Sequence, residues 1–147
     1  MPAGPRSPPS RSAAAATRWT PPCNSSPGAS SSGVPIGSFQ AVKHRLADVL
    51  VALEAARSAS AYATACVVLA SPQLPVAASA AAALCSETYR LATAEYVQLH
   101  GGIGFTWEHP AHLYVRRARS SEVLFGTADH HRIRLAELVG LTTRPAA

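Results

Sequence analysis

Apolar side chains recur at every third or fourth position in the segment that begins near Ser38: Phe39, Val42, Leu46, Val49, Leu50 and Leu53. This spacing gathers them on one stripe of an α-helix, so it predicts an amphipathic helix rather than a strand. Ser38 is a suitable N-cap for this helix. Pro72 and Pro75 predict where it ends, and Pro75 can occupy the first turn of the next helix.

A second helix is expected over about 75–100, where many small side chains favour close packing of neighbouring backbones. Gly101 and Gly102 end it, at a place where a positive φ is commonly needed. Glycine again separates the two helices that follow.

The third helix is expected to open at His109 and Pro110 and to run to Phe125. Gly126 breaks the pattern, and Thr127 can cap a fourth helix that extends to about residue 141. No stretch of the sequence alternates as a strand does. The sequence therefore predicts an all-α fold, an up-and-down bundle of about four helices joined by short connections.

The segment 1–33 contains Pro, Ser, Ala and Gly with scattered arginines, and it shows no periodicity. Such a composition buries too little apolar surface to offset the entropy of ordering it. We therefore expect a disordered leader over 1–33 and one helical domain over 34–147. The lack of acidic residues is also typical of a transit peptide, although prolines oppose the helix that such peptides form. A shifted reading frame is a third account of this segment.

The net charge of +5 belongs largely to this leader. Three of the thirteen Lys and Arg residues lie in it, whereas all eight Asp and Glu residues follow it. The folded part is thus close to neutral, and its run of Arg116, Arg117 and Arg119 is interpreted as a solvated or ion-paired helix face. We expect no nucleic-acid partner, because such a partner favours a basic stripe on a folded face.

No charged residue lies between Arg57 and Glu87, a stretch long enough to cross a bilayer. Alanine and serine dominate it, however, and the sequence SPQLP (Ser71–Pro75) interrupts it in the middle. A break with two prolines would leave main-chain groups unsatisfied in lipid. The sequence therefore predicts two helices that meet at a turn, and no membrane span.

The three cysteines, Cys23, Cys66 and Cys85, are far apart and form no CxxC pair. This pattern argues against a disulfide framework or a zinc site and favours a reducing compartment, so a cytoplasmic location is expected. Histidines are also frequent near the helix breaks, but no pair has the i, i+4 spacing of a helical zinc motif, and we expect no metal. They are His100, His109, His112, His130 and His131, with Glu108 and Asp129 nearby.

Gly101, Gly102 and Gly104 form a glycine elbow between the second and third helices. Glycines can expose consecutive main-chain N–H groups, and the N-terminus of the next helix adds positive potential, so the elbow suits an anion such as a phosphate. A GGxG sequence is equally an ordinary loop between two helices. It is not a dinucleotide fingerprint, because no strand precedes it.

Three segments in order resemble the C-terminal helical domain of the acyl-CoA dehydrogenases. They are GVPIGSFQAVKHRLAD, QLHGGIGFTWEHPAHLYVRRAR and LFGT, and the likeness covers about Gly33 to Leu141. Its strongest element is the pattern Gln-x-x-Gly-Gly-x-Gly-aromatic. A Glu-x-Pro, an arginine-rich helix and a Gly-Thr pair follow it at the matching distances, and the order of these pieces makes the resemblance specific.

The resemblance implies FAD as the cofactor and a fatty acyl-CoA thioester as the substrate. In that family a glutamate removes the α-proton while a hydride passes from the β-carbon to the flavin. The glycine-rich break lies at a subunit interface and contacts FAD held mainly by the neighbouring subunit, which implies a homo- or hetero-oligomer. The matching cofactor contacts are Phe39, Gln40, Gln98, Leu99, His100, Gly101, Gly102, Thr127 and Asp129, and Gly126 matches a position beside the thioester.

The chain departs from the family at the catalytic base. Many members carry the base as the glutamate of a Tyr-Glu-Gly-Thr tetrapeptide, and here Phe125 stands at that position. No catalytic residue is therefore carried over. Ala29 and Ser32 likewise stand where the family has the Arg and Phe of another contact segment. Phenylalanine accepts no proton, whereas general-base catalysis typically contributes about 10²–10⁴-fold.

The family's N-terminal helical domain and middle β-domain, which hold most of the flavin and substrate, have no counterpart in this sequence. We therefore expect little or no turnover by the isolated chain. Two hypotheses remain open. The first is a C-terminal, FAD-contacting and oligomerising domain of an acyl-CoA dehydrogenase, since some family enzymes pair a base-carrying subunit with one that lacks the base. The second is a non-enzymatic helical module that associates with a larger partner.

Overall fold

The computed structural model describes residues 30–31 and 34–141, which fall into two units that divide after Ile36. In the first unit, β1 (Ser30–Ser31) pairs antiparallel with β2 (Val34–Pro35). The sequence predicts no strand, so this short hairpin corrects that expectation, and β1 lies within the segment predicted to be disordered. The remainder of that predicted leader lies outside the described residues.

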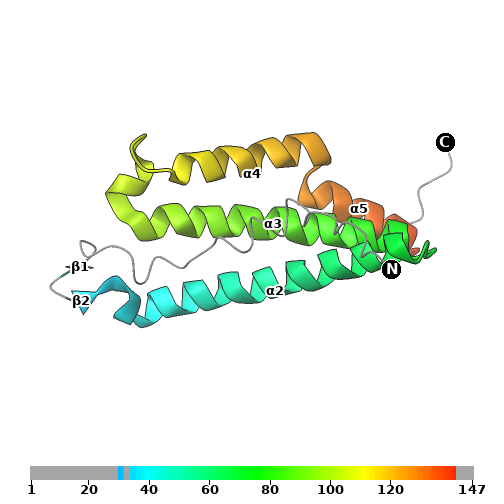
Figure 1. Ribbon diagram of the computed structural model, residues 1–147, viewed down its shortest axis with the longest axis horizontal. Coiled ribbons are helices and arrows are strands. Elements are labelled where there is room, and N and C mark those ends of the chain that lie inside the picture. The colour runs from blue at the N-terminus through cyan, green and yellow to red at the C-terminus, as the bar shows by residue number, and fades with distance from the viewer. Residues whose placement is uncertain (1–29, 32–33, 142–147) are drawn as a thin grey trace, which may run out of the picture. The chain divides into compact units, whose positions relative to one another are not determined.

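The second unit is all-α, as predicted, and Figure 1 shows its helices. The 3₁₀ segment η2 (Ile36–Ser38) precedes α2 (Gln40–Val68) and α3 (Leu74–His100). A second 3₁₀ segment, η3 (Gly101–Phe105), leads to α4 (Ala111–Phe125) and α5 (Ala128–Leu138). The four α-helices of the described residues match the predicted number, and Pro75 lies in the first turn of α3 as expected.

The start of α2 corrects the predicted cap. Its N-cap is Phe39, with extended backbone angles, and not Ser38, which belongs to η2. Phe39 offers no capping side chain, so its carbonyl oxygen alone closes the first turn by accepting the N–H groups of Val42 and Lys43 at 3.1 and 3.2 Å. The predicted end is confirmed, because α2 stops at Val68 and Ala70 turns the chain with a φ of 47°.

Small side chains allow α2 and α3 to approach closely. The hydroxyl of Thr88 donates to the carbonyl oxygen of Ala52 at 3.1 Å, and the thiol of Cys85 lies 3.8 Å from the carbonyl oxygen of Ala56. A side chain of one helix thus reaches the main chain of the other at two points, with the helices antiparallel. The buried residues are Val49, Ala56 and Cys66 on α2 and Ala77, Ser79, Ala81, Ala83, Thr88 and Thr93 on α3.

The predicted apolar stripe of α2 is correct only in part. Val49 is buried, and Val42, Leu46 and Leu53 are partly buried, but Phe39 and Leu50 remain 46% and 52% exposed. Adjacent helix residues point about 100° apart, so a residue beside Val49 turns away from the contact line. Because α2 packs mainly against α3 alone, only a narrow strip of its surface is covered.

α3 is the central helix of this unit. It makes the main contacts with α2, α4 and α5, and Figure 1 shows α2 and α4 on opposite sides of it, with α5 at the end of α3 away from the elbow. Arg132 on α5 forms an ion pair with Glu87 on α3. The ring of Tyr114 on α4 lies 5.7 Å from that of Tyr96 on α3, between centroids.

The charge-free residues 58–86, here called the neutral hairpin, form the second half of α2, the turn and the first half of α3. This is the arrangement of two helices meeting at a turn that the sequence predicts. The N–H of Ser71 bonds to the carbonyl oxygen of Cys66 at 2.9 Å and so closes the turn. Among the described residues, no helix combines the length and the apolar character needed to cross a membrane.

Candidate functional site

The glycine elbow connects α3 to α4, and its outer face is open. Gly101 ends α3 with a φ of 58°, the positive value that the sequence predicts. Gly101 and Gly102 are exposed, and a Cβ added to either would meet no atom within 4 Å. Gly104 is buried, and a Cβ there would lie 2.6 Å from the carbonyl oxygen of Val97. The elbow thus combines an accessible main chain with one glycine that close packing requires.

Four rings support the elbow, and we call Tyr96, His100, His109 and Tyr114 the elbow ring cluster. The centroid of the His100 ring lies 4.3 Å from that of His109 and 4.5 Å from that of Tyr96. The His100 Nδ1–H donates to the carbonyl oxygen of Tyr96 at 2.7 Å. Burial lowers the pKa of His109, and the positive charges that His100 and His112 can carry lower this pKa further.

Two of the three groups of predicted cofactor contacts lie at this end of the helical unit. Gln98, Leu99 and His100 form the last turn of α3 and lead directly into the elbow. Phe39 and Gln40 begin α2, which runs antiparallel to α3, and Figure 1 shows that this start lies at the end of the helix pair where the elbow lies. An ion pair between Arg45 and Glu95, at 3.5 Å, joins the two helices nearby. The side chains of Phe39, Gln40 and Gln98 are exposed, whereas Leu99 and His100 are partly buried.

The third group lies at the opposite end of α4, at a corner formed by residues 126–129. Gly126 ends α4 with a φ of 95°. Thr127 caps α5 as predicted, since its Oγ1 accepts the N–H of His130 at 3.2 Å. Asp129 follows in the first turn of α5. The 15 residues of α4 span about 22 Å, so one chain does not bring the corner and the elbow into a single site.

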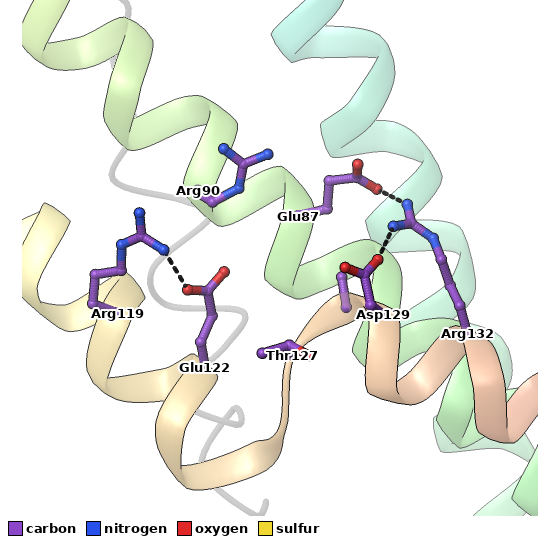
Figure 2. A pocket seen from close by; sticks show the side chains of 8 residues that line it. Glu87, Arg90, Arg119, Glu122, Thr127, Asp129 and Arg132 are labelled. Atoms are coloured by element: carbon purple, nitrogen blue, oxygen red, sulfur yellow. Dashed lines mark hydrogen bonds and ion pairs between the residues drawn. The ribbon is translucent and has the colours of Figure 1, made fainter.

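A cleft of about 330 Å³ opens beside this corner, and Figure 2 shows its lining. Arg132 on α5 forms ion pairs with Glu87 on α3 and with Asp129, the latter at 3.2 Å. On α4, Arg119 pairs with Glu122 at 3.0 Å. Arg90 forms no ion pair with any described residue. The cleft is therefore polar and formally neutral, with three arginines and three carboxylates, and Arg90 is the arginine of its lining outside these ion pairs; Thr127 and Ala128 complete the lining.

Sequence reasoning does not find this cleft, because its charged side chains come from three helices. The interpretation of Arg119 as part of an ion-paired helix face is confirmed by its bond to Glu122. The i, i+3 spacing of Arg119 with Glu122, and of Asp129 with Arg132, is the local signal that could have indicated the two pairs within helices. No local signal indicates that Glu87 on α3 meets Arg132.

Phe125, which the sequence resemblance assigns to the family's base position, ends α4 and is 74% exposed. Its carbonyl oxygen accepts the Nε2–H of His131 at 2.7 Å. That ring also packs on the corner, because a Cβ added to Gly126 would lie 3.2 Å from His131 Nε2. The corner is therefore held in shape, but Phe125 brings no proton acceptor to it. Within the described ranges, no group of three or more His, Cys, Asp or Glu side chains could hold a metal ion.

The family model described as the acyl-CoA dehydrogenase C-terminal domain matches residues 28–140. The chain belongs to the acyl-CoA dehydrogenase family. This family assignment accounts for the order of the glycine elbow, the arginine-rich helix and the Gly126 corner. It also agrees with the resemblance on which the predicted cofactor contacts depend.

Similar acyl-CoA dehydrogenases come from several bacteria. The chain is 49% identical over 92 residues to acyl-CoA dehydrogenase IpdE2 of Mycobacterium tuberculosis, covering 63% of this chain and 27% of that protein. It is 47% identical over 87 residues to acyl-CoA dehydrogenase FadE34 of the same organism, covering 58% and 12%. It is 33% identical over 97 residues to a short-chain specific acyl-CoA dehydrogenase of Megasphaera elsdenii, covering 66% and 25%.

The chain therefore spans between about an eighth and about a quarter of the length of these curated relatives. No solved structure matches the chain. The comparisons thus identify this chain as a C-terminal helical domain of the acyl-CoA dehydrogenase family, and this domain includes the elbow and the corner.

Proposed function

We propose that this chain is the part of an acyl-CoA dehydrogenase that contacts FAD and joins subunits. The complete reaction would remove the α-proton of an acyl-CoA thioester and transfer a hydride from the β-carbon. FAD, when bound, supplies the hydride acceptor. The observation that carries the proposal is the open main chain of Gly101 and Gly102, which lies at the same end of the helices as Phe39 and Gln40.

The main chain of Gly102 fits the phosphate groups of FAD, whereas the N–H of Gly101 already bonds to the carbonyl oxygen of Gln98. Main-chain N–H groups donate to phosphate oxygens, and a glycine without Cβ permits their closest approach. Gly102 leaves this approach open, because no atom lies within 4 Å of the position its Cβ would take. The exposed amide of Gln98 adds a further donor.

The Gly126 corner would serve a second cofactor rather than the same one. Thr127 and Asp129 lie at the start of α5, about 22 Å of helix away from the elbow. This separation supports an arrangement in which each FAD lies between two subunits. One subunit would then contribute its elbow and the other would contribute its corner.

The neutral hairpin supports such an assembly. Tyr62, Val68 and Leu69 are 55%, 78% and 75% exposed, although no charged residue lies anywhere in residues 58–86. A helix without charge on any face is normally buried, and large exposed apolar patches mark interaction sites. We infer that another subunit covers the outer side of this half of α2. That subunit is either a second copy of the chain or a relative that carries the catalytic base.

Catalysis would depend on that relative, because Phe125 cannot accept the α-proton. The isolated chain is therefore proposed to have little or no dehydrogenase turnover. Purified chain that reduced its own FAD on addition of an acyl-CoA would refute this point. A carboxylate supplied by another subunit would restore the missing step.

The alternative function is a non-enzymatic helical module that binds a larger protein. The observation that favours it is the exposure of Val123, Leu124 and Phe125, which reaches 86%, 75% and 74% at the end of α4. Under this alternative, the apolar surface serves only for docking, and neither FAD nor acyl-CoA binds. Cofactor binding therefore separates the two functions.

The test is a titration of FAD fluorescence with the purified full chain and two variants. Saturable quenching is expected for the native chain, and Gly102→Val is expected to weaken it about tenfold, equivalent to about 1.4 kcal/mol. Its Cβ would meet no atom within 4 Å, and the side chain would cover the main chain that faces the ligand. Ala47→Val, at an exposed position of α2 away from the elbow, is the matched control. No saturable quenching, or equal affinity for native and Gly102→Val protein, would overturn the proposal and leave the docking module.

A further inference from the structure

His109 accepts a hydrogen bond from the first main-chain N–H group of α4. Pro110, the N-cap, has no N–H, so Ala111 presents the first main-chain donor of the helix that lacks a partner within it. The N–H of Ala111 donates to His109 Nδ1 at 3.3 Å. An N–H group can be accepted only by an unprotonated ring nitrogen. The geometry therefore requires a neutral His109 whose hydrogen is on Nε2.

The two neighbouring histidines have the opposite requirement. His100 Nδ1 faces the carbonyl oxygen of Tyr96 at 2.7 Å, and His112 Nδ1 faces the carbonyl oxygen of His109 at 2.8 Å. Because a carbonyl oxygen only accepts, each of these Nδ1 atoms must carry hydrogen. Protonation of either ring leaves its bond intact. Protonation of His109, by contrast, removes the acceptor that binds the N–H of Ala111.

A charged His109 would also meet unfavourable surroundings. From α3 it faces Tyr96 and His100, and from α4 it faces His112, while Tyr114 of α4 completes the ring cluster. Its chain neighbour Glu108 is exposed, and no carboxylate of the described residues forms an ion pair with His109. The positive end of the α4 dipole lies beside the ring as well. Each of these features favours the neutral form.

His109 also connects α4 to the elbow. Its ring centroid lies 4.3 Å from that of His100, the residue that immediately precedes Gly101. The same ring contacts Tyr96 at 5.6 Å. One imidazole thus bonds the first N–H of α4 and stacks on the last residue of α3, on either side of the glycines. Loss of this contact would release the two anchors of the elbow together.

We propose that His109 is a positioning residue for the glycine elbow and that it holds the elbow only while its ring is neutral. The functional consequence rests on the proposed function, in which the elbow faces FAD. Acidification would then loosen the main chain of Gly101 and Gly102, and the cofactor affinity of the elbow would fall. The elbow itself is expected to respond to pH whether or not FAD binds there.

The test follows ring nitrogens and main-chain amides by NMR in the ¹⁵N-labelled full chain, from about pH 8 to about pH 5, across the range in which histidines titrate. At the upper end, His109 is expected as the Nε2–H tautomer. On acidification, the amides of Ala111 and Gly102 are expected to shift with the midpoint of His109. The proposal would be overturned if His109 were the Nδ1–H tautomer. It would also be overturned if the amide shifts of Ala111 and Gly102 did not change at the midpoint of His109.

Three variants separate positioning from mere packing. His109→Asn keeps an acceptor for the N–H of Ala111 but does not titrate, so the amide shift at that midpoint should disappear while the neutral-pH spectrum of the elbow is retained. His109→Ala removes the acceptor, so the elbow amides should differ from those of the native protein at neutral pH and should show no shift at the midpoint of His109. His44→Asn, on the exposed surface of α2, is the control, and its elbow amides should shift with the same midpoint as those of the native protein. Persistence of the transition in His109→Asn would contradict the proposal.

Failure of this test can be distinguished from failure of the proposed function, because none of these measurements uses FAD. The link between the two is tested by repeating the FAD titration at several pH values. Affinity should fall with acidification in the native chain and stay level in His109→Asn. Parallel pH dependence in the two proteins would overturn the role of His109 in cofactor affinity.

Discussion

Thr88 on α3 donates its hydroxyl hydrogen to the carbonyl oxygen of Ala52 on α2, at 3.1 Å. Thr88 is only 6% exposed, so the bond is shielded from water. A threonine side chain is short, and it reaches the main chain of a neighbouring helix only where the two backbones lie close. This bond therefore helps to fix α2 on α3, which in turn keeps Gln40 at the elbow end of the unit.

Thr88→Val should lower the free energy of unfolding by about 1 kcal/mol, the typical net contribution of one such hydrogen bond. Valine preserves the shape of the side chain and removes only the donor. Thr64→Val is the matched control, because the hydroxyl of Thr64 bonds within α2 to the carbonyl oxygen of Ser60 at an exposed position. Urea unfolding of both variants provides the measurement. If both variants lost the same free energy of unfolding, the bond between the helices would stabilise the protein no more than the bond within α2.

Gly104→Ala should destabilise the protein by about 1–3 kcal/mol, the usual cost of overpacking. The added Cβ would lie 2.6 Å from the carbonyl oxygen of Val97, which is main chain and cannot rotate away. Gly102→Ala meets nothing within 4 Å and should change stability by no more than about 0.5 kcal/mol. Thermal unfolding compares the two alanines directly. A harmless Gly104→Ala would mean that the elbow adapts easily.

The α2–α3 turn and the end of α3 were predictable because each depends on one local constraint, whereas the N-cap of α2 was not. Pro75 restricts the backbone and has no N–H, whereas Gly101 tolerates the positive φ at which α3 ends, so each residue marks a helix boundary through its own chemistry. The exposure of Leu50 was not predictable in the same way. The sequence shows which residues are apolar, but the width of the covered strip depends on how many helices pack against α2.

The candidate site also has features that the sequence predicts and features that it does not. The cap at Thr127 and the positive φ at Gly101 follow from the chemistry of single residues, so the sequence predicts them. The stacking of His109 on His100 and the ion pair between Glu87 and Arg132 require α4 and α5 to dock on α3 in one register. No spacing along the chain encodes that register. The family resemblance names residues at both ends of α4 but does not reveal the distance between them.

Acid should destabilise the folded chain through His109. Its pKa is lowered in the folded state, so the unfolded chain binds a proton at pH values where the folded chain does not. The stability that the neutral ring contributes is complete above the unfolded pKa, about 6.5, and is lost as the pH falls through the lower folded value. Urea midpoints across this range should fall more steeply for the native protein than for His109→Asn. Identical slopes would contradict the assignment of this pH dependence to His109.

Val68→Lys should disperse an assembly that uses the neutral hairpin. Val68 is 78% exposed at the last turn of α2, where a cation suits the helix dipole, so the fold should tolerate the change. The new charge would have to be desolvated on docking. Light scattering should report a smaller mass than that of the native chain, with unchanged circular dichroism. Ser120→Lys, exposed on α4, should keep the native mass, and an unchanged mass for both would place the interface elsewhere.

α3 makes the main contacts with every other helix, while α2 and α4 lie on opposite sides of it. The unit therefore has two separate seams and no single enclosed interior. We therefore expect α2 to be able to detach from α3 while α4 and α5 stay docked. A subunit that binds α2 would stabilise the packing of α2 on α3 and would leave the packing of α4 and α5 on α3 as mobile as before.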